Sequence, residues 1–257
     1  MQLRHRLVPY IYTINAQAAT PQTNLTLVQP LYWNFPSREI AYQFPYEFFF
    51  GSSLIVAPIV RPRDKRTNLA KTRVWVAPRR HVDIFTGYVF DGDREINMYR
   101  DLQHIPVLAA EGSIIPLDRE SVPANGCANP NAFEVFIVVG HDGQFNILEN
   151  TRDDQGSQAS TETVRSIPIE YDQAAGRVTA VAAGKEWTFR FISFSTVSDI
   201  RVLVDGSVAT EAECSVETEK HHLSVVVKVP AAKNLDSVIT IELGPNPQLD
   251  IIDHTKP

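Results

Sequence analysis

Hydrophobic positions change their spacing after the first fifth of the chain. In residues 2–19, apolar residues recur three, four and seven positions apart, as on one helical face, so we predict a helix there. Pro9 should start or kink that helix, because proline lacks the amide hydrogen and clashes with the preceding turn. Residues 25–31 predict one buried strand. Residues 39–50 predict a short helix that Gly51 ends.

From residue 54 onward, short apolar runs alternate with turn residues, which indicates β-strands. We predict strands at residues 54–59, 73–76, 82–85, 105–108, 114–117, 133–139, 145–148, 177–182, 186–194, 200–204, 223–229 and 238–243. Asp142-Gly143 and Asp205-Gly206 predict hairpin turns, since glycine accepts the positive φ that such turns need. Strands at this spacing are typical of β-sandwiches. The Pro-, Gly- and Asn-containing segment 118–131 predicts a domain boundary.

Composition narrows the class of protein. The 257 residues include 30 acidic and 24 basic ones, for a net charge of -6, and 44% are hydrophobic, which excludes intrinsic disorder. The acidic balance argues against a nucleic-acid partner, and no apolar run reaches the roughly 20 residues of a membrane span. No signal peptide is visible after Met1, and the localisation stays open. Cys127 and Cys214 allow one bridge or two separate thiols.

The first 50 or so residues are an incomplete unit. A helix, one strand and a second short helix are too few for a parallel α/β sheet, which needs several βα units to bury both faces. We therefore expect this part to belong to something larger. A lone strand would leave open edges, and the helix face of Leu3, Leu7 and Ile14 would be exposed.

Four segments resemble, in the same order, motifs of glycoside hydrolase family 31, the α-glucosidase and α-xylosidase family. They are Arg-Leu-Val-Pro-Tyr-Ile-Tyr at 6–12, Gln-Pro-Leu-Tyr-Trp-Asn-Phe-Pro at 29–36, Phe-Gly-Ser-Ser-Leu-Ile-Val-Ala-Pro at 50–58, and Ile-Pro-Val with Glu-Gly-Ser-Ile-Ile-Pro-Leu at 105–117. Residues 119–257 match more loosely. Gln29 stands where the family commonly has arginine, and Pro45-Tyr46-Glu47 replaces a usual triplet, so the resemblance leaves the substrate open.

The resemblance implies a retaining enzyme built on a (β/α)-barrel, with one Asp as nucleophile and another as general acid/base. In this family the nucleophile lies in a Trp-x-Asp-Met segment. The residues two positions after Trp33, Trp75 and Trp187 are Phe35, Ala77 and Phe189. The resemblance therefore implies a carboxyl-terminal part that lacks catalytic residues and is inactive alone.

The expected fold is mainly β, with two β-sandwich domains preceded by a remnant of a (β/α)-barrel. The remnant holds the last helices and the last strand and spans residues 1–52. The proximal domain spans 53–118 and the distal domain 119–257.

Tyr32 and Trp33 are the candidate substrate-binding residues. They follow the expected last barrel strand, and barrel enzymes build their active sites at the carboxyl ends of strands. Plain core packing is the alternative for both. Asn24 begins an Asn-Leu-Thr triplet, the acceptor pattern of N-glycosylation. Glu47 lies among aromatic residues, where its charge either reaches solvent or is buried with a raised pKa.

No cofactor or metal site is expected. Asp91, Asp93 and Glu95 indicate a solvated turn, because the position where an EF-hand needs glycine is Ile96. His221 and His222 are adjacent, so on a strand they would point to opposite faces.

Two functions remain open. In the first, the chain is the carboxyl-terminal portion of an α-glycosidase and acts on an α-linked oligosaccharide or glycoside only with the upstream half. In the second, it is a non-catalytic β-sandwich module with a carbohydrate-binding or stabilising role. An incomplete gene product is a third hypothesis, which the nucleotide sequence upstream of Met1 would test.

Overall fold

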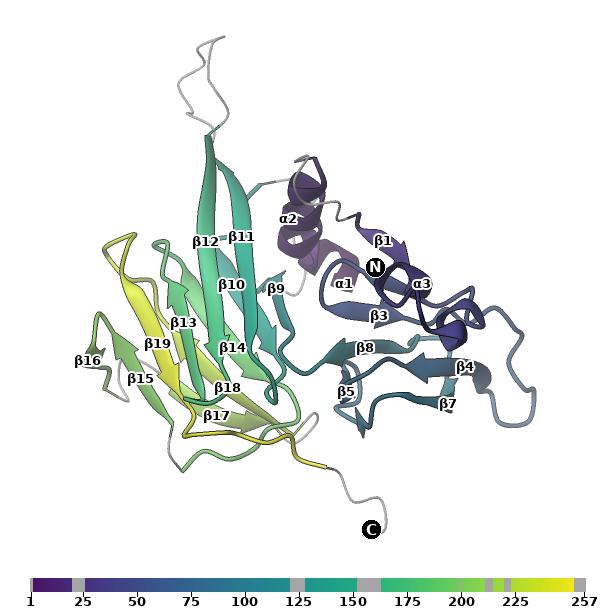
Figure 1. Ribbon diagram of the computed structural model, residues 1–257. Coiled ribbons are helices and arrows are strands. Elements are labelled where there is room, and N and C mark those ends of the chain that lie inside the picture. Colours follow the sequence, from purple (N-terminus) through teal and green to yellow (C-terminus); the bar gives the residue numbers. More distant parts are fainter. Residues whose placement is uncertain are drawn as a thin grey trace.

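The computed structural model describes residues 2–19, 26–120, 128–151, 163–198, 200–210, 215–219 and 223–251. Strands hold 43% of these described residues and helices 11%, so the predicted mainly-β fold is confirmed. Figure 1 shows two β-rich parts side by side, with the amino-terminal helices packed near their junction. Within the described residues, no helix has the length and apolar character needed to cross a membrane.

The predicted first helix is interrupted near Pro9. It consists of α1 (Gln2–Arg6) and α2 (Val8–Ala18), and Pro9 lies in the first turn of α2, where a missing N–H costs no helical hydrogen bond. The Tyr10 ring stacks on Phe145, with centroids 5.4 Å apart. The Thr13 hydroxyl accepts a 3.0 Å hydrogen bond from the backbone N–H of Leu148. Ile14 is buried, so the expectation that this helix face is exposed is wrong for Ile14, because strands of the distal part cover it.

The next three strands belong to the proximal sheet. They are β1 (Val28–Pro30), β2 (Phe48–Phe50) and β3 (Leu54–Val56), and the short helix α3 (Leu31–Asn34) and the 3-10 helix η1 (Glu39–Tyr42) lie between β1 and β2. Residues 48–50 form a strand and not the end of a helix, because β2 pairs antiparallel with β1 on one side and β3 on the other. The strand expected to be alone is therefore paired on one side and lies at the sheet edge.

The proximal part consists of a six-stranded sheet and a two-stranded ribbon. Its further strands are β4 (Ala70–Val76), β5 (His81–Asp83), β6 (Val89–Phe90), β7 (Arg94–Arg100) and β8 (Val107–Ala110). The sheet order is β1-β2-β3-β8-β5-β6, and β4 pairs with β7. Ile55, Trp75 and Leu108 form the core between the two layers. Sequence reasoning missed β7, because Ile96 and Met98 are its only aliphatic residues and most of the others are charged.

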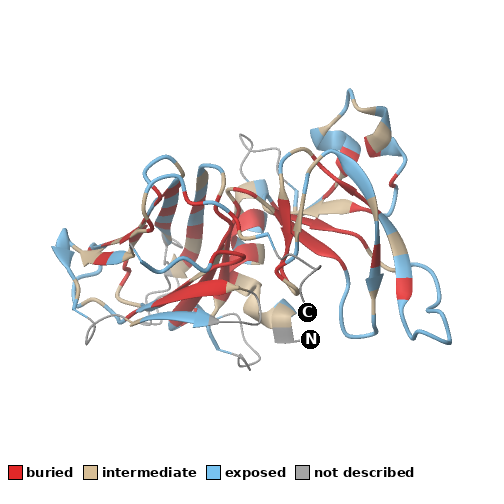
Figure 2. Cartoon of the chain, turned by 90° about the horizontal axis from the view of Figure 1, so that it is seen from below, coloured by how far each residue is buried: buried red, intermediate tan, exposed pale blue. Residues whose placement is uncertain are grey.

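The distal part is a sandwich of two sheets. Its strands are β9 (Ile114–Asp118), β10 (Ala132–Ile137), β11 (Gly143–Thr151), β12 (Thr163–Asp172), β13 (Arg177–Val181), β14 (Glu186–Phe191), β15 (Arg201–Val204), β16 (Ser207–Val208), β17 (Ser215–Glu219), β18 (Ser224–Val229) and β19 (Val238–Glu242). The sheet orders are β17-β18-β14-β10-β9 and β11-β12-β13-β19-β15-β16. Phe133 and Trp187 face Ile167 and Ile239 in one core cluster. Buried residues concentrate along these inner faces (Figure 2).

Two connections bear on the domain organisation. β9, the last strand of the predicted proximal range 53–118, pairs with β10 in the distal sandwich. The prediction of a hairpin at Asp142-Gly143 is wrong, because β10 and β11 belong to different sheets and the turn crosses between them. Asp205-Gly206 does form a hairpin turn between β15 and β16, with φ of 50° and 77°.

Candidate functional site

An exposed aromatic surface follows β1. Pro30 holds extended backbone geometry, and the single turn of α3 then buries Leu31 while it turns Tyr32 and Trp33 outward. Tyr32 and Trp33 are 44% and 55% exposed. The Tyr32 ring stacks on Tyr42 of η1, with centroids 5.0 Å apart and planes 8° apart. We call Tyr32, Trp33 and Tyr42 the aromatic surface.

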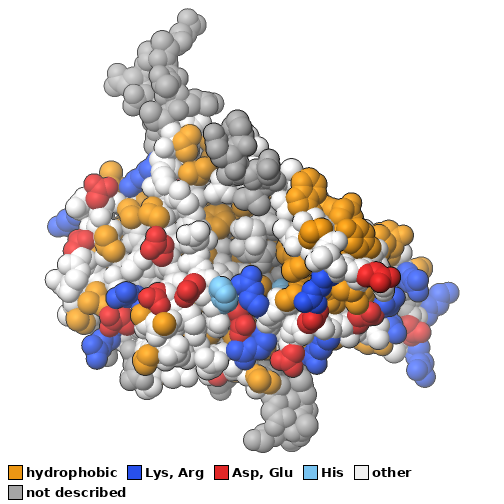
Figure 3. All heavy atoms as spheres, in the orientation of Figure 1, with side chains coloured by type: hydrophobic (Ala, Val, Ile, Leu, Met, Phe, Trp, Pro, Cys, Tyr) orange, Lys and Arg blue, Asp and Glu red, His pale blue; other side chains and the backbone are white. Residues whose placement is uncertain are grey.

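The aromatic surface is not part of a core. Figure 3 shows hydrophobic side chains gathered over β1, α3 and η1. Stacked rings at a surface present flat apolar faces, and such faces suit the C–H face of a sugar ring or the apolar face of another protein segment. Contact with sugar stays a prediction for Tyr32 and Trp33. Asn24, the predicted glycosylation site, lies outside the described residues.

Glu47 is a buried carboxyl group whose surroundings shift its pKa strongly. It is 3% exposed, and its Oε2 accepts a 3.0 Å hydrogen bond from the backbone N–H of Trp75. Within the described residues, its Oε1 has no hydrogen-bond partner. Burial raises the pKa of Glu47 to about 8, and the Trp75 hydrogen bond offsets only part of that. Of the two readings of Glu47, burial is the one that the structure supports.

A groove of about 850 Å³ opens beside Glu47. Segments 43–47 and 57–73 form most of its walls, and Tyr99 of β7 also lines it. Sequence reasoning missed this groove. The available signal was the run 61–73, which holds six Lys or Arg residues and one acid, in a chain with a net negative charge.

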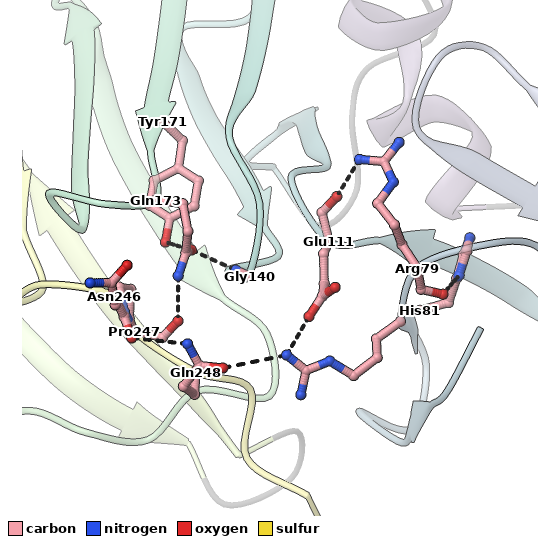
Figure 4. Close-up of polar contacts among 10 residues, drawn as sticks. Arg79, His81, Glu111, Gly140, Tyr171, Gln173, Asn246, Pro247 and Gln248 are labelled. Carbon is pink, nitrogen blue, oxygen red and sulfur yellow. Dashed lines mark hydrogen bonds and ion pairs between the residues drawn. The ribbon is translucent and has the colours of Figure 1, made fainter.

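A polar network connects the proximal and distal parts (Figure 4). Its centre is Glu111, which follows β8. Arg80 Nη2 lies 2.6 Å from Glu111 Oε1 as an ion pair, and Arg80 also donates to Gln248 at 3.4 Å. Arg79 donates to the Glu111 carbonyl at 3.4 Å. A positive-φ glycine, Gly140, approaches the Glu111 carboxylate so closely that a Cβ there would overlap it.

The network continues into the distal sandwich through Gln173. Its Oε1 accepts hydrogen bonds from the Gly140 N–H at 2.7 Å and the Tyr171 hydroxyl at 2.6 Å, and its Nε2 donates to the Pro247 carbonyl at 2.8 Å. Burial lowers the pKa of nearby His81 to about 4, so this imidazole is neutral near pH 7. These contacts join loops of both parts.

The other carboxylates weighed from the sequence are engaged by arginines. Asp93 pairs with Arg38, and Glu95 pairs with Arg73. Among the described residues, no group of three or more His, Cys, Asp or Glu side chains could hold a metal ion. Both cysteines, His221 and His222 lie outside those residues.

Comparison with known proteins shows which family this chain resembles. Residues 24–115 match the family model for the glycosyl hydrolase family 31 C-terminal domain. Alpha-glucosidase 2 of Bacillus thermoamyloliquefaciens is 25% identical over 215 residues, which cover 80% of this chain and 26% of that protein. The alpha-xylosidase of Saccharolobus solfataricus is 25% identical over 177 residues, 67% of this chain and 22% of that protein. The chain thus spans about a quarter of these relatives.

Solved structures share the fold. The cycloalternan-forming enzyme from Listeria monocytogenes, solved with a pentasaccharide substrate, matches 97% of this chain and 23% of its own, with a TM-score of 0.73 and 22% identity. The dextranase FjDex31A of Flavobacterium johnsoniae matches 94% of this chain and 32% of its own, with a TM-score of 0.72 and 18% identity. The family-model match, the α-glucosidase and α-xylosidase relatives and the shared fold support the resemblance of this chain to the carboxyl-terminal part of glycoside hydrolase family 31 enzymes.

Proposed function

We propose that this chain is the carboxyl-terminal portion of a retaining α-glycosidase that hydrolyses the O-glycosyl bonds of α-linked glucosides or xylosides. The observation that carries the proposal is the family-model match at 24–115, together with relatives that are an α-glucosidase and an α-xylosidase. The two substrate classes come from these two relatives, and the chain's own residues favour neither.

The chain by itself is proposed to be inactive. A retaining glycosidase needs two carboxyl groups about 5–5.5 Å apart, one as nucleophile and one as acid/base. In the related family the nucleophile belongs to a Trp-x-Asp-Met segment, and each of the three tryptophans here is followed two positions later by Phe or Ala. The catalytic aspartates would then come from the barrel portion that precedes these segments in the family.

The aromatic surface would meet that barrel portion. Tyr32 and Trp33 belong to α3, which directly follows β1, and their exposed rings would border the sugar-binding pocket or pack against the barrel. Among the described residues β1 is an edge strand of its sheet, and its outer side would offer backbone groups for pairing with a further strand. Both features suit a partner that is the upstream half of the same enzyme.

The test compares hydrolysis of aryl α-glucosides and aryl α-xylosides by the purified 257-residue chain, alone and mixed with the upstream half. We expect no turnover by the chain alone and measurable turnover by the mixture. A Trp33→Ala chain in the same mixture should lose activity, whereas Tyr88→Ala, an exposed ring elsewhere in the proximal part, should not. Hydrolysis by the chain alone that co-purifies with it through two separations would refute the proposal.

A second candidate function is a non-catalytic carbohydrate-binding or stabilising module. The stacked, exposed Tyr32 and Tyr42 rings are the observation that favours it. It predicts saturable binding of maltose, isomaltose or starch by the isolated chain, lost in Trp33→Ala. Calorimetry that detects no heat with any of these ligands or with xyloglucan fragments would eliminate it.

A further inference from the structure

The groove beside Glu47 carries concentrated positive charge. Arg61, Arg63, Arg66 and Lys71 line it and are exposed. We call this the basic groove. Figure 3 shows Lys and Arg side chains gathered at the end of the proximal part where this loop projects. The rest of the chain carries excess acid, since the whole chain has a net charge of -6. The local positive field therefore opposes the overall charge and would attract an anion.

The acidic residues at the basic groove do not neutralise these four cations. Asp64 Oδ1 accepts hydrogen bonds from the backbone N–H groups of Arg66 and Thr67 at 2.9 and 2.8 Å, which shapes the loop. Arg73, a fifth cation of the lining, already pairs with Glu95 and lies over the Phe44 ring at 5.0 Å. No side-chain ion pair or hydrogen bond is formed by the four cations within the described part of the chain.

The basic groove also offers flat apolar faces and a buried polar group. Tyr46 and Tyr99 line it and are 64% and 52% exposed. An exposed tyrosine presents an apolar face and a hydroxyl, a combination that suits a sugar ring. Glu47 also lies in the lining and is only 3% exposed. Its Oε1 has no hydrogen-bond partner among the described residues. A buried polar atom without a partner costs stability unless a bound molecule supplies one.

We propose that the basic groove binds a sugar that carries a phosphate or a carboxylate. The guanidinium groups of Arg61, Arg63 and Arg66 would pair with the anionic group, because planar guanidinium matches both anions in a two-pronged contact. The Tyr46 and Tyr99 rings would stack on the sugar, and Glu47 Oε1 would contact a ligand oxygen. A groove of about 850 Å³ lies within the usual size range of small-molecule sites.

This site goes beyond the proposed glycosidase function and does not depend on it. It is formed by segment 43–47, by the connection from β3 into β4 and by Tyr99 of β7, and it requires no catalytic aspartate. Loss of hydrolysis therefore says nothing about this groove, and loss of anion binding says nothing about hydrolysis.

Isothermal titration calorimetry on the purified chain tests the proposal with four probes: glucose 6-phosphate, glucuronate, glucose and inorganic phosphate. We expect saturable binding of one of the two anionic sugars, at least about tenfold tighter than glucose and than inorganic phosphate, as expected for one lost charge-assisted contact or one lost stacking contact. Added salt should weaken this binding, since the cations are exposed.

Variants assign the binding to the groove. Arg63→Gln combined with Arg66→Gln removes two of the three guanidinium groups assigned to the anion and should weaken binding of the anionic sugar about tenfold or more. Tyr46→Ala should weaken binding of the anionic sugar but leave the affinity for inorganic phosphate unchanged. Arg201→Gln, an exposed arginine on β15 of the distal sandwich, is the matched control and should change nothing. All four residues are exposed, and equal thermal unfolding midpoints would show that the variants fold.

Three results would overturn the proposal. Equal affinity for inorganic phosphate and the sugar phosphate would reduce the groove to an anion site without sugar recognition. Tighter binding of a short single-stranded oligonucleotide that the double variant abolishes would assign it to nucleic acid. Absence of binding to either anionic sugar, or binding that the double variant leaves intact, would mean that the cations serve only to solvate the loop.

Discussion

Replacing Glu47 by glutamine should remove a large pH dependence from the stability of this chain. The carboxyl group is 3% exposed and accepts one hydrogen bond, from the Trp75 N–H at 3.0 Å. A glutamine oxygen can accept the same hydrogen bond, and the amide has nearly the same volume. The substitution therefore changes the ionisation of the group and little else.

The magnitude follows from the raised pKa. Burial moves the pKa of Glu47 from 4.5 to about 8 in the folded chain. Between those pH values the folded state holds a proton that the unfolded state has lost. The stabilisation is thus fully present below about pH 4.5 and is lost as the pH rises through about 8. At about 1.4 kcal/mol per pH unit, the whole loss is roughly 5 kcal/mol.

The assay is urea unfolding of the parent chain and Glu47→Gln at about pH 5 and about pH 8.5. The free energy of unfolding of the variant, relative to the parent, should rise by roughly 4 kcal/mol between the two pH values. Histidines and other carboxylates titrate in both proteins and cancel in this difference. A difference that stays the same at both pH values would show that Glu47 is ionised and solvated in the folded chain.

Three further predictions concern polar contacts. Glu134→Ala removes the shared carboxylate of two partly buried arginines and should lower the free energy of unfolding in urea by about 3 kcal/mol. The control Glu186→Ala breaks a half-exposed ion pair and should lower it by less than about 1 kcal/mol. Equal losses in the two variants would contradict this expectation. Burial depresses the pKa of His81 from 6.5 to about 4, so its contribution to stability is present above about pH 6.5 and lost as the pH falls to about 4. His81→Gln should therefore flatten the fall of the thermal midpoint on acidification, and an unchanged fall would exclude His81 as its source. Gly140→Ala should lower the thermal midpoint by the equivalent of about 1–3 kcal/mol, because φ is +113° and the new Cβ would lie 2.4 Å from Glu111 Oε1; a parent-like midpoint would show that the network relaxes.

Local patterns were sufficient for most strands and for the helix break. The alternation of apolar and polar residues in the β14 segment and the proline in α2 act within a few residues, so the sequence carries them directly. Two of the missed strands, β7 and β12, have a diluted pattern. β12 contains Pro168 and many polar residues, and it is a strand because β11 pairs with its residues 163–171.

For the candidate functional residues too, the local sequence predicted one part of their environment and the fold decided the rest. The sequence placed Tyr32 and Trp33 after a strand, and the structure adds their exposure and the Tyr42 ring stacked on Tyr32. Glu47 could be assigned to two environments from its neighbours alone. Its burial depends on Trp75, 28 residues away, whose backbone supplies the hydrogen bond.

By itself, the sequence determined the mainly-β class, the order of the family segments and the excess of positive charge at 61–73, because spacing, motif order and charge are properties of the chain read in one direction. Tertiary structure decided which strands share a sheet, which carboxyl group is buried away from solvent, and which cations and aromatic rings line one groove. The reason is physical: burial and charge pairing depend on contacts between residues far apart in the chain, and those contacts exist only once the sheets have packed.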